Sequence, residues 1–291
     1  MAIFRRSWRL TLQIGNDKAK IFQEIANDDM SLKIEFDITS NTVSYSEGTI
    51  TLYNLAKDDM YYLASCARIG ADGIMEQNKV MLECGYGGDL GIILSGNIYE
   101  VTADFTSADR KITLKARGNI AKNFEFDSVS VALNGDIDLK DICKELTKKQ
   151  QILLEYDKNI QPIIQKGYSF LGRPSQMLEN LRKSFKNLFL FYSEDGEKLI
   201  VQPKENATIS NKQPLSYETG LIGTPTPTQY GIQATSLLNK SLKMGGWIEL
   251  NSLKIPQYNG VYYIYQIKHK GSNQNNEWFS ILSLSKNVMN V

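Results

Sequence analysis

Alternating apolar and polar residues dominate the chain between Trp8 and about Gly118. In the segment TITLYNL, Ile50 and Leu52 share one face, and threonine and tyrosine occupy the other. The segment KITLKAR, residues 111–117, repeats the alternation. A period of two is typical of strands with one buried face and one solvated face. We therefore predict antiparallel β structure over this part of the chain.

Glycines and a possible helix cap divide this region further. The segment KVMLECGYGGDLGIILSGNIYEV, residues 79–101, predicts two strands around a turn at Gly87, Gly88 and Asp89. Glycine suits this turn because it tolerates the positive φ of tight hairpins. The segment NLAKDDMYYLASC predicts a short helix that begins after Asn54, a residue type favoured as an N-cap.

The pattern changes to a helical period near residue 119. Leu139, Ile142, Cys143 and Leu146 form one apolar stripe, which predicts a helix near residues 138–149 with Asp138 as its N-cap. A second helix is predicted at 174–186, because proline is favoured at a first helical position. Its stripe consists of Met177, Leu178, Leu181 and Phe185.

The link between the two helices and the segment after them are less regular. The middle of the chain is interpreted as helix, strand-poor link, helix and hairpin. The link from Leu153 to Tyr168 can hide an edge strand. The segment NLFLFYSEDGEKLIVQPK predicts a hairpin that turns at Asp195 and Gly196.

The last third contains an uncharged ribbon and two strong strands. From Leu215 to Leu250 the chain is rich in glycine, proline and threonine, with no charged residue between Glu218 and Lys240. Pro225 and Pro227 favour an extended backbone before them. We expect a packed connector rather than a loose linker, because apolar residues recur along it: Leu221, Ile222, Leu237 and Leu238.

The strand GVYYIYQIKHKG follows this ribbon and carries apolar or aromatic residues on both faces. It is therefore predicted to be buried or bonded on both sides. The segment NEWFSILSLSK is predicted to pair with it across GSNQNN as the last strand.

Charge and composition narrow the function classes. The 291 residues include 33 lysines and arginines and 32 aspartates and glutamates, and hydrophobic residues make up 42%. A substantial core can form, and no global attraction for nucleic acid is expected. The basic run Arg5, Arg6 and Arg9, with Phe4 and Trp8 between, permits nucleic-acid contact. We favour a strand start with an amphipathic arm that anchors to a partner.

The three cysteines, Cys66, Cys84 and Cys143, are odd in number and far apart. They argue against a disulfide framework and for a reducing place of synthesis. The N-terminus lacks the apolar run of a signal peptide, and no window is long enough to span a membrane. We expect a soluble protein made in the cytosol, with no membrane anchor.

No catalytic constellation is evident. His269, the only histidine, is predicted to lie at a solvated strand end between Lys268 and Lys270. The acidic clusters DFTSAD and FYSEDGE are predicted to form turns, and GYGGDLG leads into a strand, so it lacks the helix of a phosphate-binding loop. We assign no catalytic, cofactor-binding or metal residues and expect no enzyme and no cofactor.

Several short motifs stand near the two ends of the chain: RRSWRL, LKIEFDI and ITLYNL near the N-terminus, and TGLIGTP, GIQATSLLNKSLKMGGWIEL and NGVYYIYQIKHKG near the C-terminus. Together they resemble the baseplate hub proteins of long-tailed bacteriophages. The family's proline after LLN is absent, since Lys240 and Ser241 stand there. The matching residues are Gly220, Leu221, Ile222, Gly223, Pro225, Gly231, Leu237, Leu238, Asn239, Leu242, Gly245, Asn259, Gly260, Tyr262, His269, Gly271 and Trp278.

The resemblance implies an α+β fold, mainly antiparallel β, with two tail-tube-like β-barrels and a helix-containing middle segment. Residues 1–125 would form the first barrel. Residues 126–291 would form the second unit, with helices and hairpin at 126–210 and β structure at 211–291. We leave open that the ribbon 211–250 packs back on the first barrel.

The function implied by the resemblance is that of a structural virion protein. It would be a homotrimeric ring in the tail baseplate that joins a hexameric tail tube to a three-fold central spike. DNA would pass through its lumen without specific binding, and the tape measure and other baseplate proteins are further candidate partners. The alternatives are a cell-wall glycosidase and a carbohydrate-binding β module of a tail tip.

Overall fold

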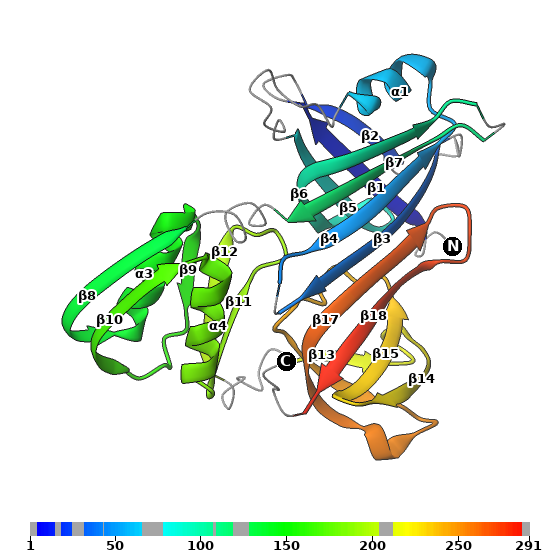
Figure 1. Cartoon of the computed structure of the whole chain (residues 1–291). Helices are drawn as coiled ribbons and strands as arrows, with labels where there is room; N and C mark the ends of the chain where they lie inside the picture. Colours follow the sequence, from blue (N-terminus) through cyan, green and yellow to red (C-terminus); the bar gives the residue numbers. More distant parts are fainter. Residues whose placement is uncertain are drawn as a thin grey trace.

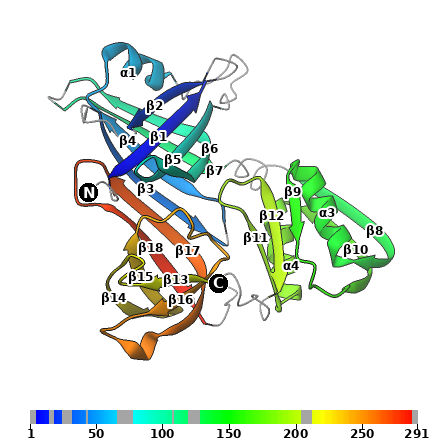
Figure 2. The same ribbon diagram turned by 180° about the vertical axis from the view of Figure 1, so that it is seen from behind.

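Three bodies make up the structure, a computed structural model that describes residues 5–14, 19–24, 32–42, 44–65, 78–106, 109–118, 128–203 and 212–286. Figure 1 shows an N-terminal β body, a middle lobe with two helices and a C-terminal β body. Figure 2 shows from behind that the middle lobe lies to one side of the two β bodies. The mainly antiparallel β fold predicted from the sequence is confirmed.

The N-terminal body is a strongly curved antiparallel sheet in the order β3-β4-β7-β6-β5-β1-β2. Its inward residues form one core that includes Trp8, Leu52 and Leu114, all fully buried. The glycine turn is confirmed, since Gly87 and Gly88 have φ values of 58° and 87° between β5 and β6. The elements are β1 (Arg6–Gln13), β2 (Lys20–Glu24), β3 (Lys33–Asn41), β4 (Glu47–Tyr53), α1 (Lys57–Ala64), β5 (Asn78–Tyr86), β6 (Asp89–Asp104) and β7 (Lys111–Gly118).

The predicted cap of helix α1 is wrong. The helix begins at Lys57 with Ala56 as its N-cap residue. Asn54 instead has a φ of 59°, and its backbone N–H donates to the carbonyl of Arg110 over 3.1 Å. Asparagine tolerates the left-handed conformation better than most residues, so it serves the turn after β4 rather than the helix.

The middle lobe contains both predicted helices. Helix α3 has Asp138 as its N-cap, whose carboxylate accepts a hydrogen bond from the Lys140 backbone N–H at 3.2 Å. Helix α4 begins with Pro174, as predicted. The elements are β8 (Val129–Asp138), α3 (Leu139–Gln150), β9 (Leu153–Tyr156), β10 (Ile164–Gly172), α4 (Pro174–Ser184), β11 (Leu188–Tyr192) and β12 (Lys198–Pro203).

The interpretation of the middle as strand-poor between its helices is wrong. Strands β8 and β10 form an antiparallel pair, and β9 joins the β11–β12 hairpin in parallel to β12. The strand hidden between Leu153 and Tyr168 is therefore present as β9 and the start of β10. Gly135 and Gly167 have positive φ, and the β8–β10 register shifts next to Gly167. The resulting irregularity weakened the period-two signal in the sequence.

The C-terminal body continues the sheet of the N-terminal body. Strand β17 pairs with β18, with β16 through Gly260–Tyr263 and with β3 through Gln266–Ser272. Its prediction as a strand buried or bonded on both sides is confirmed, since Tyr262 and Tyr263, which point to opposite faces, are both buried. The elements are β13 (Gln213–Ser216), β14 (Leu221–Thr228), β15 (Gly231–Leu237), β16 (Trp247–Asn251), the 3-10 helix η2 (Pro256–Tyr258), β17 (Gly260–Ser272) and β18 (Trp278–Ser285).

The uncharged ribbon forms strands rather than a connector. Strands β14 and β15 make an antiparallel hairpin, and β15 pairs with β18. Leu221 packs in the core of the C-terminal body, and Leu238 packs in that of the N-terminal body. The path from β14 to β2 is open at both ends within the part of the chain that the structure describes. The domain boundary expected at residue 125 lies outside the described residues.

The contact between Gly245 and Phe191 makes a stability prediction. Gly245 has a φ of 74°, and an added Cβ would lie 2.0 Å from the Phe191 Cζ. Gly245→Ala should lower the free energy of unfolding by about 2–4 kcal/mol, since it combines positive-φ strain with overpacking.

Gly223→Ala is the matched control. Gly223 has a φ of 69° with no atom within 4 Å of an added Cβ. Only the backbone strain remains there, so about 1 kcal/mol is expected. Urea denaturation of both variants measures the difference. Equal losses would contradict the predicted clash with Phe191.

Candidate functional site

His269 is buried, which corrects the expectation of a solvated strand end. Its side chain is 2% exposed, and its Nδ1 lies 2.9 Å from the Ser280 hydroxyl on the adjacent strand. Burial, and to a smaller degree the nearby Lys243 ammonium, lowers the pKa of His269 to about 3. The neutral imidazole joins β17 to β18. The flanking lysines misled the assignment, because in a strand Lys268 and Lys270 point to the face opposite His269.

The acidic and glycine-rich candidates serve turns, as predicted. Asp195 accepts a hydrogen bond from the Glu197 backbone N–H at 3.1 Å in the β11–β12 turn. Asp104 accepts one from the Thr106 backbone N–H at 3.0 Å. Residues 107–108 of the DFTSAD cluster lie outside the described residues. The GYGGDLG segment links β5 to β6, so it is not followed by the helix that a phosphate-binding loop requires.

The basic run at the N-terminus begins a strand, but its contacts are internal. Arg6 donates to the Ser272 carbonyl at 2.6 Å and also to that of Asn275, and lies over the Trp278 ring at 5.8 Å. Arg9 contacts the Glu83 carboxylate at 3.5 Å. Arg6 therefore ties the N-terminal strand to the β17–β18 turn. Phe4 lies outside the described residues.

Other chemical candidates are few. Across the described residues, no group of three or more histidine, cysteine, aspartate or glutamate side chains is arranged to hold a metal ion. Cys84 and Cys143 are free and buried, and burial raises the pKa of Cys143 to about 12. Cys66 lies outside the described residues. No described helix has the length and apolar character needed to cross a bilayer.

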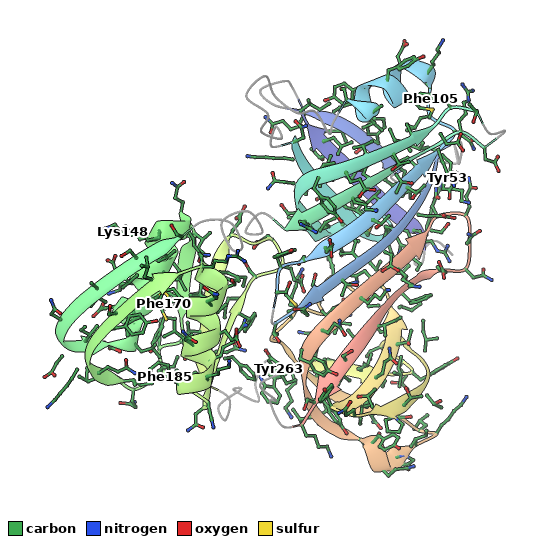
Figure 3. The ribbon with its side chains drawn as sticks, viewed as in Figure 1. Tyr53, Phe105, Lys148, Phe170, Phe185 and Tyr263 are labelled. Atoms are coloured by element: carbon green, nitrogen blue, oxygen red, sulfur yellow. The ribbon has the colours of Figure 1, made fainter. Side chains whose placement is uncertain are left out.

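The most elaborate arrangement is the seam where the middle lobe meets the two β bodies. We define the seam by the β11–β12 hairpin and the residues that contact it. The Phe189 and Tyr263 rings stack with centroids 4.1 Å apart, and Trp247 meets Tyr263 edge-on at 5.7 Å. Figure 3 labels Tyr263 at this boundary. Sequence reasoning missed the seam because its members are far apart along the chain.

Polar bonds flank these rings. The Glu194 carboxylate accepts from the Met244 backbone N–H at 2.9 Å and from the Lys243 ammonium at 3.0 Å. The Gln202 amide donates to the Gly245 carbonyl at 3.0 Å. The Arg182 guanidinium donates to the Leu190 carbonyl at 2.7 Å and also to the carbonyl of Thr42. The partners in the β bodies are mostly backbone groups, which leave no signature in the sequence.

The outermost strand β14 is a second candidate surface. Its only strand partner among the described residues is β15. Ile222 is 41% exposed, and the hairpin carries no charge. Pro227 is also exposed, and proline is tolerated in edge strands where its missing N–H would face outward. The edge is therefore uncharged, but its pairing is restricted at Pro227.

A family comparison decides the class of this protein. The family model of baseplate hub gp41 matches residues 8–283, which is most of the chain. The chain belongs to the baseplate hub gp41 family. No curated protein matches the sequence.

Solved structures agree in fold. The chain is similar to a 43 kDa tail protein of prophage MuSo2 from Shewanella oneidensis, with a TM-score of 0.62, 11% identity and coverage of 96% and 97% of the two chains. It is also similar to a tail protein from Neisseria meningitidis MC58, with a TM-score of 0.65, 11% identity and coverage of 95% and 96%.

A third relative comes from a secretion system. The E. coli c3393 protein, a component of the type VI secretion system with structural similarity to T4 bacteriophage tail proteins gp27 and gp5, has a TM-score of 0.58 and 9% identity. The similarity covers 90% of this chain and 76% of that one. Family membership and fold together support a structural role in a phage tail or baseplate, in association with other tail proteins.

The buried His269 of this hub-family protein predicts a pH dependence of stability. The unfolded chain binds a proton at this imidazole below about pH 6.5, whereas the folded chain does not until about pH 3. Its contribution to stability is therefore present above pH 6.5 and lost as the pH falls. The loss at pH 5 should be about 2 kcal/mol.

His269→Asn should remove this part of the pH dependence, measured by urea denaturation between pH 5 and 7. Ser280→Ala is the control, since it deletes the hydrogen-bond partner but keeps the titrating ring. If His269→Asn and the wild type lost stability equally over that range, a buried neutral histidine would be excluded.

Proposed function

We propose that this chain is the structural hub of a phage baseplate and that three copies form a ring. The ring adapts a hexameric tail tube to a three-fold central spike and encloses the channel for DNA. Each chain contributes two tail-tube-like β units, so three chains present six. The tape measure and other baseplate proteins are further candidate partners.

One observation carries this proposal. Strand β17 bonds to β3 of one β body and to β16 and β18 of the other, so two curved β bodies sit side by side within one chain. This arrangement suits a pair of neighbouring positions in a ring. We assign residues 1–125 to the first unit and 126–291 to the second, with the middle lobe inserted between the β segments.

The strand edges support assembly with neighbours. An open sheet edge presents unpaired N–H and C=O groups that another strand can satisfy. The edge strand β14 is free of charge, so covering it removes no ion from water. Pro227 limits pairing at the far end, which favours contact near Ile222. Rings of this kind can close on a template, so the isolated chain can remain monomeric.

The pairing of cations with carboxylates fits a channel with little affinity for the phosphates of DNA. Cations on the sheet are paired with carboxylates: Lys115 with Glu100 at 2.8 Å, Arg117 with Glu47 at 3.2 Å, and Lys268 with Asp37 at 3.0 Å. Paired cations leave less positive charge for phosphate contacts, which provide most non-specific affinity for DNA. The virion tail is the expected location, with assembly in the host cytoplasm.

A charge placed on the β14 edge tests the assembly surface. Ile222→Asp should block the formation of complete tails, because an unpaired carboxylate would be buried at the contact. The isolated variant should unfold at the wild-type urea concentration, since Ile222 is 41% exposed. Complementation followed by electron microscopy measures tail formation. Lys158→Glu, in an exposed turn of the middle lobe, is the control. If the Ile222→Asp variant formed normal tails, the proposal that β14 is an assembly surface would be wrong.

The position in the particle tests the hub itself. Electron microscopy of tails labelled with an antibody to this protein should show label at the distal end of the tube. Label along the whole tube, or on peripheral fibres alone, would refute the hub. Cell-wall lysis or glycan binding by the purified chain would favour the enzymatic or carbohydrate-binding alternatives.

A further inference from the structure

The middle lobe is built as a separate body. Its helices and strands enclose their own core, which includes Leu146, Leu181 and Leu199, all buried. Among the described residues, none of its strands pairs with a strand of the large sheet. Figures 1 and 2 show that β11 and β12 are the part of the lobe nearest the β bodies. Contact with the rest of the molecule therefore runs mainly through one hairpin.

The aromatic stack forms the tightly packed part of this contact. The Phe189 and Tyr263 ring planes are 5° apart, and both side chains are buried. Phe191 lies against Gly245, where no side chain would fit. Parallel rings at a fixed separation resist moving apart, but they permit small rotations about their common axis.

Packing is much looser around the tip of the hairpin. A cleft of about 450 Å³ is lined by Ser193, Glu194 and Asp195 from the tip, and by Ile92 and Lys240 from the β bodies. A second cleft, of about 400 Å³, lies between Glu197 of the same hairpin and the outer face of β1, β5 and β6. The tip thus borders two clefts, with room to move.

Glu194 holds the tip in its present position. Its side chain is 10% exposed and bridges the Met244 backbone N–H and the Lys243 ammonium. Its own carbonyl accepts from the Ser46 hydroxyl at 3.2 Å. One residue thus bonds to both β bodies at once. Charge-assisted bonds of this kind are roughly twice as strong as neutral ones.

We infer that the middle lobe rocks as a rigid body about the Phe189–Tyr263 stack, and that Glu194 is the latch that holds it docked. Rocking changes the two clefts and leaves the cores of the lobe and the β bodies intact. This is a hinge motion in the usual sense, with a packed pivot and a discrete contact that is made or broken. The inference concerns the isolated chain and does not depend on the ring.

Tryptophan fluorescence reports on this motion. Of the three tryptophans, Trp8 and Trp278 are buried in the N-terminal core, and Trp247 alone lies at the seam. Glu194→Ala should raise the acrylamide quenching of Trp247 by about twofold or more, because the undocked state exposes the ring. The increase should vanish when Trp247→Phe is added. Glu197→Gln, on the same hairpin without the latch bonds, should match the wild type.

Amide hydrogen exchange on the same proteins tests whether the middle lobe moves as a rigid body. In Glu194→Ala, exchange should accelerate by about tenfold at Met244–Gly246, while the amides of β8, β10 and α3 keep wild-type rates. If Glu194→Ala does not fold, Glu194→Gln, which keeps the size but not the charge, is measured instead and should show the same pattern. Unchanged quenching and exchange would overturn the latch. Acceleration throughout the lobe core would overturn rigid-body rocking.

Discussion

Strand β17 is the element on which the rest of this structure depends. Its first half bonds to β16 and its second half to β3, while β18 accompanies both. The change of partner occurs at a bulge next to Tyr265, whose carbonyl accepts the Thr42 backbone N–H at 3.1 Å. A bulge bends the strand and increases its twist, so one strand can serve two curved bodies. Without this shared strand, both bodies would expose an edge of unpaired backbone groups.

This arrangement leaves the main path of the sheet open at β14 and β2 among the described residues. Between the two bodies, the backbone groups of the sheet bond to its own strands and to Asn273. The Asn273 side chain accepts from the Ile34 N–H at 2.9 Å and donates to the Leu32 carbonyl at 2.8 Å. Pairing is therefore left to the outermost strands. At β14, the absence of charge permits contact with another strand, and the missing N–H of Pro227 restricts where such pairing can form.

The middle lobe adds a third body with a different kind of attachment. Backbone hydrogen bonds join the two β bodies, whereas aromatic packing and a few side-chain bonds join the lobe to them. A shared ladder fixes register over many residues, so it resists rotation. The β11–β12 hairpin on its ring stack, with the bond from Arg182 of α4 to the Thr42 carbonyl, provides less resistance. The same molecule thus combines two β bodies joined by a backbone ladder with a lobe held mainly by side-chain contacts.

Local pattern in the sequence determined many of the elements, because the spacing of apolar residues along one strand or helix sets which of its faces is apolar. The alternation in β4 and β7, the apolar stripe of α3 with its Asp138 cap, and the glycine turn at Gly87 all follow from neighbours along the chain. Tertiary structure decided what each element touches. His269 has the same local pattern whether its strand face is open or covered, and only the fold shows that this face is covered.

The seam was also decided by tertiary structure. Glu194 looks like any turn residue until Lys243 and Met244 are brought beside it by the fold. The partners in these side-chain bonds are more than 40 residues apart along the chain, and most of the acceptors and donors in the β bodies are backbone atoms. Such contacts have no local signature in the sequence.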